Sequence, residues 1–145
     1  MKIVVDTNIL ISIFIKPDGR IADLFDSLKF HASLYISDYS LIEIANHTTK
    51  ILKLSKLRKD EFEEIKFNVY KNINVINTDI VPDPFLISAF ELRKNIDEFD
   101  APIVGLALSL KAILWTGDKR LLKGLQKTFP DLIYNSSQLR ELLQL

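Results

Sequence analysis

Short apolar runs of strand length alternate along this chain with longer segments of helical periodicity, and this alternation constrains the fold more than any other feature of the sequence. Runs that are apolar at every position, such as Ile3-Val4-Val5, are typical of strands buried on both faces. Such strands belong to parallel sheets covered by helices on both sides. The predicted fold class is therefore α/β, with a mainly parallel sheet between two helical layers.

The positions of these segments predict the individual elements. Strands are expected at residues 2–6, 34–37, 73–76, 113–116 and 132–134. Helices are expected at residues 7–15, about 21–30, 38–54, 60–70, 101–111, 118–126 and 136–143, with another opened by Pro82-Asp83-Pro84. Asp38 is expected to cap the helix that runs to about Leu54. Because the sequence shows no linker, repeat or low-complexity tract, residues 1–145 are expected to form a single domain.

The composition excludes several classes of protein. The 145 residues include no Cys, so neither a disulfide scaffold nor a Cys-based metal site can form. The 19 Lys and Arg residues balance 19 Asp and Glu residues, so a polyanionic partner must be held by a local patch or a metal ion. No apolar run approaches the roughly 20 residues that span a bilayer. We therefore expect a cytoplasmic protein with no membrane partner.

Four acidic residues fall where predicted strands end or predicted helices begin. Asp6 ends the first strand, and Asp118 follows the fourth. Asp100 precedes a helix that is apolar nearly all round, and Glu43 lies in the opening turns of the helix after the second strand. In a parallel sheet these positions share one edge, where ligands usually bind. The four side chains are therefore expected to converge.

Converging carboxylates point to a bound cation. Like charges in a partly desolvated cleft raise one another's pKa values and repel. A hard divalent ion such as Mg²⁺ or Mn²⁺ removes that cost, because it prefers oxygen ligands and keeps several waters. It can also contact a phosphodiester oxygen and lower the pKa of a bound water. With no Cys and no His pair at ligand spacing, carboxylates are the metal-binding set that the sequence offers.

Each acid taken alone also has a structural interpretation. Asp and Glu are favoured at helix N-termini, where they accept orphan backbone N–H groups and meet the positive end of the helix dipole. Asp6, Asp100 and Asp118 could each be such a cap. Glu43 points away from the apolar stripe of its helix, which suits either a solvated residue or one that overlooks a cleft.

Basic residues near these acids suggest a path for a phosphate backbone. Lys50 lies at the seventh position after Glu43, with His47 between them on the same predicted polar face. We hypothesise that Lys50 and His47 steer phosphates toward the carboxylates. A second basic group begins at Lys119, next to Asp118. The alternative for both groups is a solvated helix end.

Four segments of the chain, in this order, resemble the PIN-domain ribonuclease family. They are Val4-Val5-Asp6-Thr7-Asn8, Ser40-Leu41-Ile42-Glu43-Ile44, Asp100-Ala101-Pro102-Ile103-Val104-Gly105-Leu106-Ala107-Leu108 and Leu114-Trp115-Thr116-Gly117-Asp118. The resemblance covers nearly the full chain and preserves the spacing of the segments. It implies a three-layer α/β/α sandwich with a central parallel sheet of about five strands. It also implies a Mg²⁺- or Mn²⁺-dependent nuclease, commonly the toxin of a VapBC-type toxin and antitoxin pair.

The resemblance also assigns roles to individual residues. It implies that Asp6, Glu43, Asp100 and Asp118 form the acidic metal site and carry catalysis. It further implies support for that site from Asn8 and Thr116, and an additional ligand at Asp97, one helical turn before Asp100. The partners it implies are RNA, an antitoxin protein and a second copy of the chain. The segments at 99–102 and 114–119 look more like a less characterised branch of PIN proteins than typical toxins.

The leading functional hypothesis is metal-dependent hydrolysis of RNA phosphodiester bonds. One alternative is a binding module of the same fold, for RNA or for a protein, whose activity is minor or lost. A less favoured alternative is a phosphatase in which Asp6 is the nucleophile. Such enzymes usually need a second Asp two residues later, and here that position is Asn8.

Overall fold

The chain forms a five-stranded parallel sheet in the computed structural model, which describes residues 1–92 and 100–145. The strands are β1 (Lys2–Val5), β2 (Ser33–Ser37), β3 (Asn74–Ile76), β4 (Ile113–Trp115) and β5 (Ile133–Tyr134). Their order across the sheet is β3-β2-β1-β4-β5. The predicted α/β class and the parallel sheet of five strands are confirmed.

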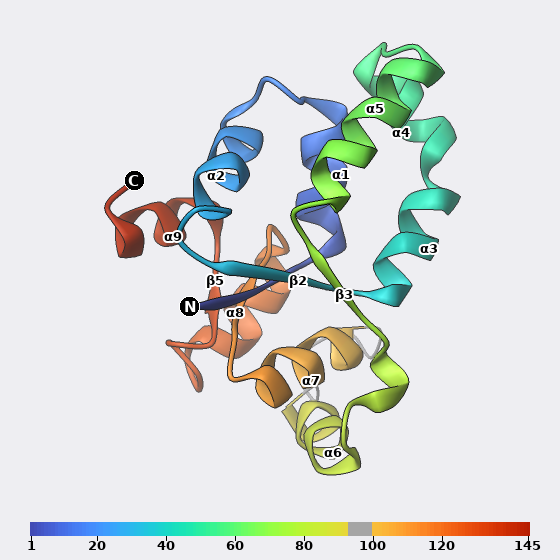
Figure 1. Ribbon diagram of the computed structural model, residues 1–145. Helices are drawn as coiled ribbons and strands as arrows, with labels where there is room; N and C mark the ends of the chain where they lie inside the picture. Colours follow the sequence, from blue (N-terminus) through green and yellow to red (C-terminus); the bar gives the residue numbers. More distant parts are fainter. Residues whose placement is uncertain (93–99) are drawn as a thin grey trace.

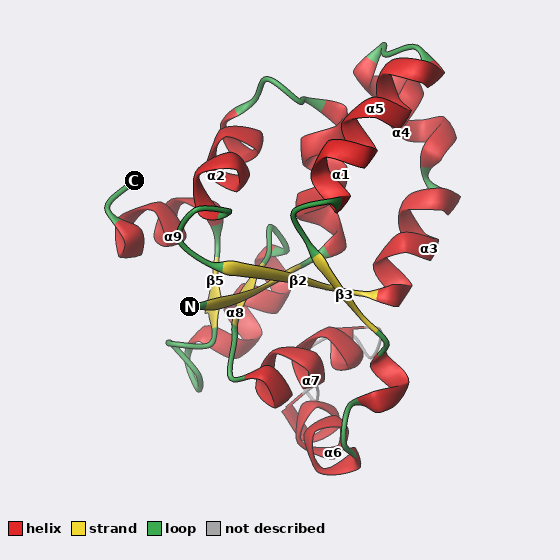
Figure 2. Cartoon of the chain, viewed as in Figure 1, coloured by secondary structure: helices red, strands yellow, loops and turns green. Residues whose placement is uncertain are grey.

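Helices cover both faces of this sheet (Figure 1). The described helices are α1 (Thr7–Ile15), α2 (Arg20–Leu28), α3 (Asp38–Asn46), α4 (Thr48–Ser55), α5 (Lys59–Tyr70), α6 (Asp83–Leu92), α7 (Ala101–Leu110), α8 (Lys119–Gln126), α9 (Ser136–Leu143) and the short 3₁₀ helix η1 (Thr78–Ile80). Figure 2 shows α1 to α5 on one side of the strands and α6 and α7 on the other. Most predicted elements begin and end within two residues of these bounds.

The central strand β1 supplies side chains to both hydrophobic cores. Ile3 and Val5 pack in the core beneath α1 to α5 and α9, whereas Val4 packs in the core beneath α6, α7 and α8. All three are fully buried. This division follows from the period of two in a strand, which points successive side chains to opposite faces.

Helix α7 is the buried helix that the sequence predicts. Its packing against α6 is close at Gly105, where a β-carbon would lie 3.1 Å from Cδ2 of Leu86 and would make that side chain shift. A helix glycine costs about 1 kcal/mol relative to Ala, so close packing is the compensating gain. Within residues 1–92 and 100–145, no helix combines the length and apolar character needed to cross a membrane.

The predicted helix from Asp38 to about Leu54 is divided in the structure. Helix α3 ends at Asn46 and α4 begins at Thr48, with His47 between them in a non-helical conformation. Nδ1 of His47 lies 2.7 Å from the carbonyl oxygen of Glu43, and the Thr48 hydroxyl donates to the carbonyl of Ile44. Side chains that bond to nearby carbonyls compete with the helical ladder, which explains the break.

The cap of α3 also differs from the prediction. Ser37, not Asp38, is the N-cap, and its Oγ accepts the N–H of Tyr39 at 3.0 Å. The Asp38 carboxylate instead binds Thr78, accepting its backbone N–H at 3.2 Å and its hydroxyl at 3.0 Å. Asp38 therefore connects the start of α3 to η1, 40 residues later.

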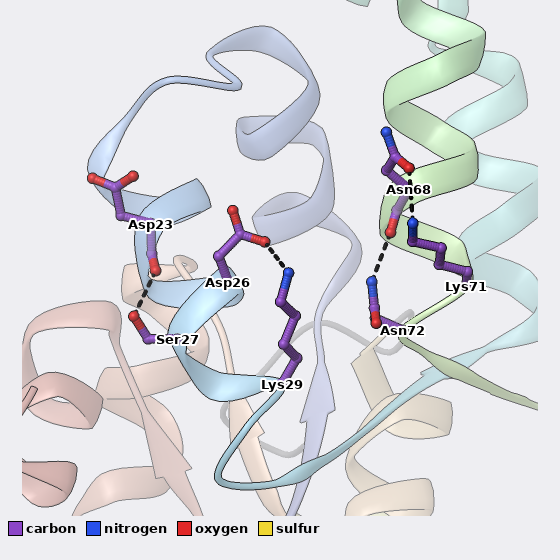
Figure 3. A network of polar contacts seen from close by, with 7 residues as sticks. All are labelled: Asp23, Asp26, Ser27, Lys29, Asn68, Lys71 and Asn72. Atoms are coloured by element: carbon purple, nitrogen blue, oxygen red, sulfur yellow. Dashed lines mark hydrogen bonds and ion pairs between the residues drawn. The ribbon is translucent and has the colours of Figure 1, made fainter.

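The polar contacts drawn in Figure 3 lie on α2 and at the end of α5, and each one stays within its own helix. Lys29 donates to Asp26 at 3.0 Å, and Lys71 donates to Asn68 at 3.1 Å. Exposed pairs of this kind contribute little to stability. The association of these helices therefore depends on the apolar side chains beneath, among them Val69.

Candidate active site

The candidate site lies where the order of strands reverses. From β1 the chain proceeds to β2 and β3 on one side, and then crosses to β4 on the other side of β1. Ligands of parallel α/β sheets bind at such a switch point, beyond the carboxyl ends of the strands. Asp6 follows β1 and Thr116 follows β4, and the N–H of Asp6 donates to the carbonyl of Trp115 at 2.9 Å.

Two polar side chains hold the Asp6 carboxylate in place. Its Oδ2 accepts the Thr116 hydroxyl at 2.6 Å and the Asn8 amide at 2.9 Å. Thr116 is fully buried, and its Oγ1 accepts the N–H of Asp118 at 3.0 Å. The single hydroxyl proton of Thr116 is therefore directed at Asp6, because the oxygen serves as the acceptor for the backbone.

Asn8 connects the segments that follow the two strands. Its Nδ2 donates to Asp6, and its Oδ1 accepts the N–H of Gly117 at 3.0 Å. Asn8 and Thr116, the two polar residues assigned to the site from the sequence, thus both contact Asp6. A network of this kind restricts the rotamers of each member.

A cleft of about 530 Å³ brings three of the four predicted acids together. Three acids line it: Asp6, which follows β1, Glu43, which lies within α3, and Asp100, which precedes α7. The Thr7 hydroxyl lies 2.9 Å from Oγ of Ser40 and 3.4 Å from Oε1 of Glu43, which links α1 to α3 beside the cleft. Glu43 is exposed and also lines the cleft, so it fits both interpretations, a solvated residue and one that overlooks a cleft.

Asp118 lies beside the cleft and has a structural role as well. Its Oδ1 caps α8 by accepting the N–H groups of Arg120 at 2.8 Å and Leu121 at 3.2 Å. It lines a neighbouring hollow together with Asn8. Its charge nevertheless acts on Asp6, so the two carboxylates are electrostatically coupled. By contrast, Asp6 and Asp100 are the N-cap residues of α1 and α7, but neither side chain accepts a capping hydrogen bond from its helix.

The electrostatics of the cleft disfavour its negative charges. Burial raises the pKa of Asp6, and the charge of Asp118 adds to this, although hydrogen bonds from Thr116, Thr7 and Asn8 oppose the shift. The pKa of Glu43 is likewise raised, first by burial and then by the charge of Asp6. A raised carboxyl pKa means that the ionised form is less stable here than in water.

The residues present fit a hard cation that retains water. All the polar side chains at the cleft offer oxygen, and two of the carboxylates have pKa values raised by burial and by neighbouring charge. Within residues 1–92 and 100–145, no three Asp, Glu or His side chains lie close enough to bind one ion together. Mg²⁺ needs only one or two carboxylates, with waters and substrate oxygens filling the other positions. Asp97 lies outside the described residues.

The predicted basic residues are both exposed and lie outside the described lining of the cleft. Lys119 is the first residue of α8, and Lys50 lies in α4. Glu43 lies in α3 and Lys50 in α4, so the two are not on one uninterrupted helix, and their shared face stays a prediction. Steering of phosphates by these lysines stays a prediction.

The sequence analysis did not single out several residues that line the cleft. Ser40 and Thr7 are buried polar residues, and Tyr39 and Ile42 are large side chains open to solvent. The signal that could have found Tyr39 is its position four residues before Glu43, which places both on one helix face.

Comparisons with known proteins agree with this architecture. Residues 4–144 match the family model of the PIN domain. Among solved structures, the chain is similar to one in the crystal structure of VapBC2 from Rickettsia felis bound to a DNA fragment from their promoter. The TM-score is 0.69 at 16% sequence identity, over 93% of this chain and 98% of that one. Comparison with curated proteins gives no significant match.

Proposed function

This chain belongs to the PIN domain family, and from that premise we propose that it is a divalent-metal-dependent ribonuclease that hydrolyses RNA phosphodiester bonds. One observation carries the proposal. Asp6 lies at the switch point of the sheet, held by Thr116 and Asn8, and its pKa is raised by burial and by a neighbouring carboxylate. Carboxylates whose pKa values are strongly raised by burial and by neighbouring charge occur mostly at functional sites.

We assign the binding of Mg²⁺ or Mn²⁺ to one or two carboxylates drawn from Asp6, Glu43 and Asp100, which line the cleft, with waters and substrate oxygens filling the other positions. Asp118 and Asp97 stay predicted further ligands. When bound, the ion supplies a more acidic water and stabilises negative charge on the phosphate. Hydrolysis then consumes one water, breaks one P–O ester bond and leaves one phosphate end and one hydroxyl end.

The chain's own contribution is preorganisation. Thr116 donates its proton to Oδ2 of Asp6, and Asn8 donates to the same oxygen, so the carboxylate is held before substrate arrives. Fixed acceptors of this kind need no reorganisation during the reaction. The bond between Asn8 and the N–H of Gly117 extends the same constraint to the segment after β4.

The experiment is an RNA cleavage assay with chelator-treated protein and a 5′-labelled oligonucleotide. We expect cleavage only after Mn²⁺ or Mg²⁺ is added, and none from Asp6→Asn. The matched control is Asp131→Asn, the same chemical change at an exposed residue just before β5, at the opposite edge of the sheet. Full cleavage by Asp6→Asn with clean metal rejects the proposal.

Calorimetric titration with Mn²⁺ separates the nuclease from a binding module of the same fold. The nuclease should bind Mn²⁺ with an affinity that Asp6→Asn reduces and Asp131→Asn leaves intact. A module that has lost its chemistry should show no binding that depends on these carboxylates.

We further propose that the protein acts as the toxin of a toxin and antitoxin pair in the cytoplasm and that it forms a homodimer. The fold similarity to a chain of VapBC2 supports the toxin role. Expression alone should then arrest growth, and co-expression of a small protein encoded next to this one should relieve the arrest. Growth unaffected by an enzyme that is active in vitro would separate the toxin role from the nuclease activity.

A further inference from the structure

The lining of the cleft is of two kinds. Alongside the carboxylates it includes the large side chains of Tyr39 and Ile42, both from α3. The Tyr39 residue is 49% exposed and Ile42 is 56% exposed, whereas Ile103, also in the cleft, is 8% exposed. Because both residues line the cleft beside the carboxylates, a ligand that fills the cleft contacts them. We call Tyr39 and Ile42 the α3 wall.

The α3 wall lies close to the acids along the helix. Tyr39 is four residues before Glu43, so the two share a helix face, with β-carbons about 5–6 Å apart. Ile42 directly precedes Glu43 in the chain. A ligand that reaches the Glu43 carboxylate therefore also meets the tyrosine ring one turn away.

The backbone that carries the ring is firmly held. The N–H of Tyr39 is accepted by Oγ of Ser37 at 3.0 Å and by Oδ1 of Asp38 at 3.1 Å. The same Asp38 oxygen binds Thr78. With its backbone fixed, a tyrosine side chain has only two torsions to order, so contact with a ligand costs little conformational entropy.

The described lining of the cleft includes no Lys or Arg, so no cationic side chain there attracts a phosphate. Affinity supplied by the side chains that line the cleft must then come from another part of a nucleotide. The remaining large surface of a nucleotide is the flat face of its base, which stacks on aromatic side chains. The volume of about 530 Å³ lies within the range of pockets that hold small organic ligands.

We propose that Tyr39 and Ile42 bind the nucleobase next to the scissile phosphate, with the tyrosine ring as the stacking surface. This inference rests on the proposed nuclease function and adds a residue that positions the RNA. Truncation of Tyr39 should therefore weaken RNA binding without removing any group that contacts the metal.

The first test measures binding without cleavage, in protein that carries Asp6→Asn. The probe is a short fluorescein-labelled RNA of mixed sequence in Mg²⁺, and the readout is fluorescence anisotropy. Adding Tyr39→Ala should weaken binding about five- to hundredfold, the usual effect of losing one stacked base. Adding Tyr39→Phe, which keeps the ring, should restore most of the affinity. The matched control is Phe67→Ala, which removes an aromatic side chain that is 69% exposed on α5.

The second test uses the active enzyme and RNAs in which one nucleotide at a time lacks its base. At one position beside the scissile phosphate, loss of the base should lower kcat/KM for the wild type but not for Tyr39→Ala. Such non-additivity is the signature of two groups in contact. Unfolding temperatures should show that the exposed Tyr39 can be truncated without loss of fold.

The outcomes separate the two proposals. If the wild type does not cleave RNA but Tyr39→Ala still weakens binding, the nuclease proposal fails and the base contact stands. If the wild type cleaves RNA but Tyr39→Ala matches Phe67→Ala in the binding assay, only the base contact fails. Additive losses at every abasic position, or equal binding by all the variants, would also overturn it.

Discussion

Two aspartates each directly follow one of two neighbouring strands, yet their environments are opposite. Asp6 directly follows β1 and Asp38 directly follows β2, and these two strands pair in parallel, so both residues lie at the same edge of the sheet. Partial burial would raise the pKa of Asp38, but bonds from Thr78 and Tyr39 outweigh it and hold the pKa below its usual value. The pKa of Asp6 is raised by burial.

This contrast separates a structural carboxylate from one that suits chemistry. The fold supplies donors that favour the charge of Asp38, so Asp38 stabilises the connection between α3 and η1. At Asp6 the donors do not overcome the burial and the nearby charges. Position at a strand end therefore does not by itself distinguish the two aspartates, whereas the balance of hydrogen bonds against burial does.

The largest expected difference between the two aspartates is in RNA cleavage. Asp6→Asn should lower cleavage at least about a hundredfold, because loss of a ligand costs more than loss of a residue that merely orients one. Asp38→Asn should keep most of the activity. Rates of both variants with Mn²⁺ and a labelled oligonucleotide decide this. Equal losses of cleavage rate in the two variants would contradict the different roles assigned to Asp6 and Asp38.

The hydroxyl partners of the two aspartates offer a finer comparison. Thr116→Val removes the donor to Asp6 and should lower Mn²⁺ affinity about 10- to 100-fold, as does the loss of other groups that orient a metal ligand. Thr78→Val removes the corresponding donor to Asp38 and should leave Mn²⁺ affinity unchanged. Calorimetry on both variants tests this pair, and unchanged affinity in Thr116→Val contradicts the assigned role.

Asp38→Asn and Asp6→Asn should change the free energy of unfolding with opposite signs. A carboxyl whose pKa is lowered by folding stabilises the protein above its unfolded pKa, and this contribution is lost as the pH falls through the folded value. Asp38→Asn should therefore cost about 1 kcal/mol at neutral pH, and the difference should shrink in acid. Asp6→Asn should instead stabilise the metal-free protein at neutral pH, because the wild type then carries a disfavoured charge, and this gain should vanish below about pH 4.

Unfolding temperatures in metal-free buffer between about pH 3 and pH 7 measure both effects. Addition of Mn²⁺ should raise the unfolding temperature of the wild type more than that of Asp6→Asn, since only the folded site binds the ion. If Asp6→Asn instead destabilised the metal-free protein, the hydrogen bonds to the Asp6 carboxylate would outweigh the cost of burying its charge.

The smallest expected effect concerns the exposed lysines that flank the acidic edge. Lys50→Gln should weaken RNA binding and reduce the slope of log affinity against log salt by about one, as the loss of one phosphate contact does. Lys119→Gln is expected to behave alike. Lys71→Gln, at the end of α5, is the control. A slope identical to that of the control would mean that Lys50 contacts no phosphate and belongs to a solvated helix end, the alternative interpretation of the sequence.

Much of the fold could be predicted because its signals are local. Helix α1 begins and ends at the predicted residues, as does α9, where Asn135 and Gln138 cap each other's backbone. The break at His47 was missed because apolar periodicity continues through it, while side chains of His47 and Thr48 compete for the carbonyls of Glu43 and Ile44.

The acids of the site could be predicted because strand ends are visible in sequence. What could not be predicted depends on contacts between distant segments. The Ser37 cap was missed because the Asp38 carboxylate is drawn to Thr78, a partner 40 residues away. Likewise, sequence position gave no sign that Asp118 lines a hollow adjacent to the cleft while its charge still acts on Asp6.

The hydrogen bond between Asp6 and Thr116 joins residues 110 positions apart. While the ribosome makes this protein, Asp6 emerges long before the strand that carries its partner. Until β4 pairs with β1, the central strand has one uncovered edge and the carboxylate lacks its buried hydroxyl donor. If the proposed nuclease activity is measured, this arrangement means that the site is incomplete until β4 has been synthesised and paired with β1.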